Sequence, residues 1–174
     1  ARDLDPLSPL PNSLEGQFLT LAGQLDAALD RLQKTFELDP NFWMPHLQAA
    51  SVYIEKGMYP EAVAEARKAG QLSAAQTISI AYASYALAKS GRRDEARAML
   101  NQLLKLSTER FVPPFYVALA YNGLGETDET IAWLERGFAQ RDPRMTFLKV
   151  DQKLNNVRND PRFQNLLRRI GFPQ

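Results

Sequence analysis

The chain has 174 residues, 45% of them hydrophobic, which is enough for one domain with a buried core. Positive and negative side chains nearly cancel, 21 against 20, and a net charge of +1 argues against a nucleic-acid or anionic-membrane binder. The absence of cysteine excludes disulfides and thiolate metal sites, and a single histidine leaves little scope for imidazole chemistry. No apolar run is long enough to cross a membrane, and the acidic, proline-containing start is unlike a signal peptide.

A period of 34 residues organises most of the chain, because Gly23, Gly57, Gly91 and Gly125 follow one another at that spacing. A fixed period of this length is typical of stacked helical hairpins. Aligned on these glycines, the chain divides into four units, residues 9–42, 43–76, 77–110 and 111–144. Small residues recur seven positions before each glycine, where two helix axes must approach closely: Gly16, Ala50, Ser84 and Ala118.

Each unit predicts two helices. The first helices are expected over residues 12–22, 46–56, 78–89 and 113–123, where apolar residues recur at helical spacing and a glycine follows. The second helices are expected to begin near Asp26, Pro60, Asp94 and Asp128. A carboxylate there can cap backbone amides, and a proline is tolerated in a first turn. The pattern therefore predicts an all-α fold.

These positions resemble the tetratricopeptide repeat family. The family pattern is matched by Gly16, Ala28, Leu32 and Pro40 in the first unit and by Tyr53, Ala62 and Ala69 in the second. The resemblance covers residues 1–144 and implies a right-handed α-solenoid of four helix-turn-helix repeats. It also implies a concave face, lined by the first helices, that binds protein.

The two ends of the chain depart from the four units. Asp5-Pro6 stands 34 residues before Asp39-Pro40, so residues 1–8 are expected to be the poorly ordered remnant of a preceding repeat in a longer protein. Residues 145–174 lose the period and predict capping helices, the last beginning at Asp160-Pro161.

The cap carries Arg158, Arg162, Arg168 and Arg169, which favour a solvated outer face, with a basic patch for nucleic acid as the alternative. The run Asn159-Asp160-Pro161-Arg162-Phe163 resembles the carboxy-terminal repeats of bacterial multidomain regulators. In those proteins similar repeats follow a winged-helix DNA-binding domain, a serine/threonine kinase or a class III adenylate cyclase.

The concave face is the candidate binding site, because its columns are unusually apolar for a wall that faces water. The residues predicted to bind a peptide or helix are Met44, Leu47, Ser51, Ile54, Ile78, Tyr82, Tyr85, Phe115, Tyr116, Leu119 and Asn122. The alternative is that a tight arc, or the end of the chain folding back, buries much of this surface. The fifth and ninth positions of the units lack the Lys and Asn residues with which family members bind the carboxy-terminal tails of chaperones.

The sequence predicts no catalytic residue, no cofactor and no metal site. His46 stands at a packing column, and the acidic pair Asp94-Glu95 stands at a helix start. We expect a non-enzymatic protein-interaction module or scaffold, at the carboxy-terminal part of a bacterial signalling or transcriptional regulator. It would be cytoplasmic, or periplasmic if the full protein has a membrane anchor. The alternatives are a small-ligand sensor that controls an attached enzyme or DNA-binding domain, and a self-assembly module that forms homo-oligomers.

Overall fold

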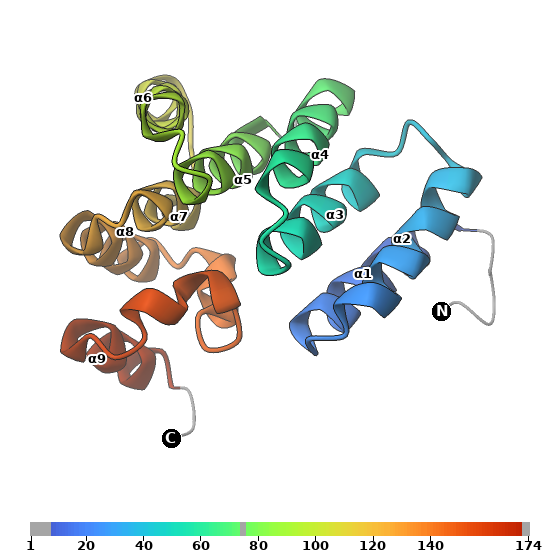
Figure 1. Ribbon diagram of the computed structural model, residues 1–174. Helices are drawn as coiled ribbons and strands as arrows, with labels where there is room; N and C mark the ends of the chain where they lie inside the picture. Colours follow the sequence, from blue (N-terminus) through green and yellow to red (C-terminus); the bar gives the residue numbers. More distant parts are fainter. Residues whose placement is uncertain (1–7, 74–75, 172–174) are drawn as a thin grey trace.

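The computed structural model describes residues 8–73 and 76–171, and every regular element within them is a helix (Figure 1). Four helical hairpins follow one another in chain order: α1 (Pro9–Leu21) with α2 (Leu25–Leu38), α3 (Trp43–Glu55) with α4 (Tyr59–Leu72), α5 (Gln76–Lys89) with α6 (Arg93–Glu109), and α7 (Pro114–Leu124) with α8 (Thr127–Ala139). The prediction of an all-α array of four hairpins is confirmed. Residues 1–7 lie outside the described residues, so the expectation of a poorly ordered remnant at 1–8 stays a prediction.

The period-marking glycines end the first helices in the way the sequence predicts. Gly23, Gly57, Gly91 and Gly125 have φ angles of 74°, 72°, 84° and 78°, a left-handed conformation that other residues adopt only with strain. The amide of Gly125 donates a hydrogen bond to the carbonyl of Asn122, three residues back. Each turn therefore reverses the chain without a long loop.

The prediction that aspartates cap the second helices is wrong in its geometry. Asp26, Asp94 and Asp128 lie inside the first turns of α2, α6 and α8, and the residues before these helices make no side-chain cap hydrogen bond. A negative charge in a first turn still favours the helix dipole, which accounts for the recurrence of these carboxylates.

The small-residue columns lie at the helix contacts. Ala50, Ser84 and Ala118 are fully buried, and the Ser84 hydroxyl donates to the carbonyl of Ala96 at 2.9 Å. A continuous apolar core runs from α3 and α4 through α9, whereas α2 and α3 share a small separate cluster of Ala28, Leu32, Ala49 and Val52.

The chain after α8 forms two 3-10 helices, η1 (Pro143–Phe147) and η2 (Gln152–Val157), followed by α9 (Pro161–Ile170). η2 contacts α7, whereas α9 packs on α8, so the chain passes along the concave side before it caps the array (Figure 1). Asp142, Asp151 and Asp160 each accept a hydrogen bond from the amide two residues later and so start these three helices.

Candidate functional site

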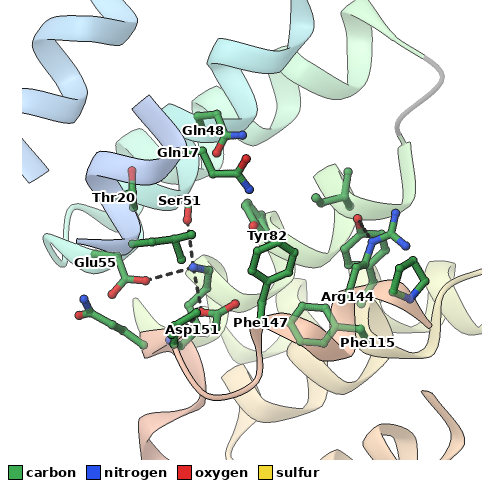
Figure 2. Close-up of a pocket in the computed structure, with 17 residues that line it drawn as sticks. Gln17, Thr20, Gln48, Ser51, Glu55, Tyr82, Phe115, Arg144, Phe147 and Asp151 are labelled. Carbon is green, nitrogen blue, oxygen red and sulfur yellow. Dashed lines mark hydrogen bonds and ion pairs between the residues drawn. The ribbon is translucent and has the colours of Figure 1, made fainter. Parts of the chain in front are cut away.

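A pocket of about 360 Å³ lies between the concave face and residues 143–157, which we call the strap (Figure 2). The volume falls within the range of about 300–1,000 Å³ that is common for ligand sites. The first helices of the four hairpins contribute one wall: Gln17, Thr20, Leu21, Gln48, Ser51, Glu55, Ile78, Tyr82, Phe115 and Tyr116. The strap contributes the other: Pro143, Arg144, Phe147, Val150, Asp151, Gln152 and Lys153.

Lys153 fixes one end of the strap to the concave face. Its ammonium donates to the Ser51 hydroxyl at 2.9 Å and lies 3.0 Å from a Glu55 carboxylate oxygen and 3.2 Å from an Asp151 oxygen (Figure 2). The ring of Tyr82 lies 5.5 Å from the ammonium. Only 5% of the lysine side chain is exposed. Three acceptors therefore match the three donors of one ammonium.

The charge of Lys153 is retained in this buried position. Burial alone would lower the pKa of the ammonium, but the negative charge of Asp151 and Glu55 outweighs it and raises that pKa above the ordinary value. The side chain is therefore a cation at neutral pH. It neutralises two carboxylates that would otherwise be desolvated without a cationic partner.

The backbone of Lys153 is also held by groove side chains. Its carbonyl accepts a hydrogen bond from the Asn122 amide at 2.6 Å and from the Tyr85 hydroxyl at 3.2 Å. The Asn122 carbonyl oxygen in turn accepts from the Asn156 amide at 2.7 Å. Burial raises the pKa of Tyr85, so its hydroxyl stays protonated and can donate.

Arg144 and Asp142 fix the opposite end of the strap. The buried Asp142 carboxylate accepts from the Phe115 amide at 3.3 Å and from the Arg144 amide at 3.0 Å. The guanidinium of Arg144 donates to the Tyr116 hydroxyl and lies 4.5 Å from the centre of that ring. Burial raises the pKa of Tyr116 to about 12. Arg144 thus remains aimed at the pocket, with its side chain about one-third exposed.

The middle of the pocket combines an apolar wall with polar groups at its rim. Tyr82 and Phe115 lie beside Phe147 of the strap (Figure 2), and Ile78 lines the same pocket. Gln17 and Gln48 lie at the other side, and neither amide is engaged by another group within the described residues. An amide offers both a donor and an acceptor, the pair that a peptide backbone requires.

The sequence-predicted binding residues divide between the pocket and the interior. Ser51, Ile78, Tyr82, Phe115 and Tyr116 line the pocket. The other predicted residues do not line the pocket. Tyr85 and Asn122 are buried, and their side chains donate to the carbonyl of Lys153. Three more are buried, Leu47, Ile54 and Leu119, and Met44 is half-buried.

Several lining residues were missed by sequence reasoning. Gln17 belongs to an inner column of the repeat, but a glutamine carries no apolar signal. Arg144, Phe147 and Lys153 lie at or beyond the end of the last repeat, where no column predicts a direction for a side chain. Only the folding back of the chain brings them to the concave face.

The remaining candidates for chemistry have structural contacts. His46 stacks on Phe36, with ring centres 4.6 Å apart, and its Nδ1 lies 2.6 Å from a Glu65 oxygen. Glu95 pairs with Arg92. In the part of the chain that the structure describes, no group of three or more His, Asp or Glu side chains is placed to hold a metal ion. No helix there is long and apolar enough to cross a membrane.

Comparison with known proteins extends these observations. No family model matches the chain. The chain is 27% identical over 142 residues to the TPR repeat-containing protein YpiA of Bacillus subtilis (strain 168), a match that covers 79% of this chain and 33% of that protein. It thus spans about a third of the length of the curated relative it matches. Among solved structures it is similar to YrrB, a TPR protein with an unusual peptide-binding site. The TM-score is 0.56 at 20% identity, and the match covers 96% of this chain and 87% of that one.

Proposed function

We propose that this chain, whose four hairpins are tetratricopeptide repeats, is a protein-interaction module that binds an extended peptide in its concave groove. The observation that carries the proposal is the pocket between the first helices and the strap, which joins an apolar wall to unengaged amides. The peptide-binding site ascribed to YrrB, which has the same fold, supports the same use of this architecture.

The pocket suits one large apolar side chain of such a peptide. Ile78, Phe115 and Phe147 would surround that side chain and shield it from water. The peptide backbone on either side would exchange hydrogen bonds with the amides of Gln17 and Gln48. Arg144 would add a donor for a backbone carbonyl or a carboxylate of the peptide.

We place this module within a longer bacterial protein, as the carboxy-terminal part of a signalling or transcriptional regulator. The resemblance of the Asp160-Pro161-Arg162-Phe163 run to the tails of such regulators supports this setting. The length of YpiA, of which the chain spans about a third, is compatible with additional domains.

Two other functions are each favoured by one observation. A pocket of about 360 Å³ could hold a small apolar ligand, as a sensor domain would. Leu10, Leu14 and Phe18 are exposed along α1 and favour self-association through that face. A small ligand would raise the thermal midpoint of the chain further as its concentration increases, and self-association would appear in light scattering.

Phe147→Ala tests the peptide proposal. The probe is an extended peptide selected from a displayed library against the chain, and its affinity is measured by fluorescence anisotropy. Loss of an aromatic anchor typically weakens binding by about tenfold or more. Phe147 is 39% exposed, so the fold should tolerate the change.

Phe111→Ala is the matched control, because Phe111 is 69% exposed and lies outside the pocket. The proposal predicts a loss of affinity for the Phe147 variant alone. Equal affinity of the two variants, or an equal loss in both, would place the peptide elsewhere on the molecule.

A further inference from the structure

We infer that the concave groove carries a binding site for an Asp-x-Lys turn of a peptide, and that Asp151 to Lys153 of the strap occupies this site in cis. The inference rests on the proposed function, because it identifies a second recognition element of the same groove. Three first helices converge on one residue of a segment that lies beyond the repeats: α3 and α5 on the ammonium of Lys153, and α5 and α7 on its carbonyl.

The contacts with Lys153 are those of peptide recognition rather than of core packing. A core position is filled at lowest cost by an apolar side chain, because a buried cation must recover its lost hydration. In the groove, the Ser51 hydroxyl and the Glu55 carboxylate replace the water molecules that the ammonium of Lys153 loses on burial, and the Tyr82 ring adds a cation–π contact. The backbone carbonyl of Lys153 accepts hydrogen bonds from the side chains of Tyr85 and Asn122 and not from the backbone of a helix or strand. A groove holds the backbone of a bound peptide segment in the same way.

The site specifies lysine over arginine. The ammonium has three donors, and it meets one hydroxyl and two carboxylates. A planar guanidinium with five donors would leave several of them unsatisfied in a space that exposes only 5% of the side chain.

The site also specifies an aspartate two residues before the lysine. Asp151 accepts from the amide of Lys153 at 3.0 Å while its carboxylate lies 3.2 Å from the ammonium. One side chain therefore shapes the turn and completes the ammonium cage. A partner that replaces the strap must bring both residues, so its expected chemistry is an Asp-x-Lys turn next to an apolar anchor for the adjoining pocket.

Because the strap occupies the site in cis, a free peptide must compete with the strap for it. A short tether holds a segment at an effective concentration on the order of millimolar, so a free peptide meets a largely occupied groove. Weakening the strap raises the fraction of molecules with an open site, and the apparent affinity for a peptide rises in the same ratio.

The test uses a labelled peptide of residues 149–160 and the full chain carrying Lys153→Met. Methionine is also unbranched and is one atom shorter than lysine, but it leaves Glu55 and Asp151 without their cation, which favours release of the strap. We expect the variant to bind the peptide at least about tenfold more tightly than the wild type does, with unchanged helicity by circular dichroism.

Two peptides of equal net charge provide the specificity control. A peptide with Lys153→Met should lose binding, whereas a peptide with Lys149→Met should keep it, because Lys149 is exposed in the strap. Equal binding of both peptides, or no saturable binding to a folded variant, overturns the inference.

A second variant covers the case in which Lys153→Met does not fold. Asn156→Ala changes an exposed residue and removes one strap-to-groove hydrogen bond while every residue of the site stays intact. We expect a smaller gain of about twofold to tenfold in peptide affinity; no gain at all overturns the inference. The Phe147→Ala and Phe111→Ala comparison is made with a different peptide on chains whose Lys153 contacts are intact, so a failure here leaves the proposed function standing.

Discussion

The first and last hairpins are built on the same repeat register, but the last is covered more completely on its concave side. Leu10 of α1 is 46% exposed, whereas Val112, one hundred and two residues later at the same column, is buried. Gln17 is half-buried in the pocket, whereas its counterpart Leu119 is fully buried. The register decides which side chains point inward, and the position in the array decides whether they meet water or the strap.

The two regions also differ in how their cores connect. Leu32 belongs to the small cluster that α2 shares with α3, whereas Leu134 belongs to the continuous core that reaches from α3 to α9. In a repeat array each hairpin is stabilised by its neighbours alone. The strap adds long-range contacts to the second, third and fourth hairpins through α3, α5 and α7, so we expect the first hairpin to open independently.

The largest expected effect comes from Leu134→Ala compared with Leu32→Ala. Both leucines are fully buried and lie nine residues after a repeat glycine. Each change should remove about 2–5 kcal/mol of local stability. The loss at Leu134 should lower the free energy of global unfolding, and the loss at Leu32 should appear as faster opening of α1 and α2.

Native-state hydrogen exchange resolved by helix, together with denaturant unfolding, measures both effects. The comparison fails if Leu32→Ala accelerates exchange uniformly across the chain. It also fails if Leu134→Ala leaves the exchange of α5 and α9 unchanged.

Gly123→Ala and Gly16→Ala sharpen the same comparison with a smaller change. A Cβ at Gly123 would lie 2.8 Å from the Cα of Tyr85, where backbone must move. A Cβ at Gly16 would lie 2.7 Å from a terminal methyl of Leu32 and 2.9 Å from its Cγ, both of them side-chain atoms, which yield more readily than backbone. We expect a cost of about 1–3 kcal/mol at Gly123 and a smaller cost at Gly16.

Gly123→Ala should also change how the strap and the 149–160 peptide compete for the groove, because the Tyr85 hydroxyl donates to the carbonyl of Lys153. Thermal unfolding gives the stability difference, and binding of the 149–160 peptide gives the effect on the strap. Equal costs at the two glycines would mean that α5 and α7 adjust as readily as a leucine side chain does.

The hairpins were predictable because helix contacts leave a periodic record of small residues and turn glycines in the sequence. The strap leaves no such record. Lys153 resembles any solvated surface lysine, and its partners Ser51 and Glu55 lie 102 and 98 residues away in the chain. At the hairpin turns the sequence instead predicted a feature that is absent, because Asp26 and Asp128 were expected to cap helices and lie in their first turns. Aspartate is favoured at both positions, and only the backbone geometry distinguishes them.

The smallest expected effect concerns the outer face of the cap, where Arg169 lies 2.8 Å from Glu135 of α8. These side chains are 44% and 35% exposed, in contrast to the buried pair of Lys153 and Glu55. Water and salt screen an exposed pair, so a double-mutant cycle of Arg169→Ala and Glu135→Ala should give a coupling below about 1 kcal/mol that falls as salt is added. A larger, salt-independent coupling would show that the cap is fastened from its outer face as well. The strap would then no longer be the main difference between the two ends of the array.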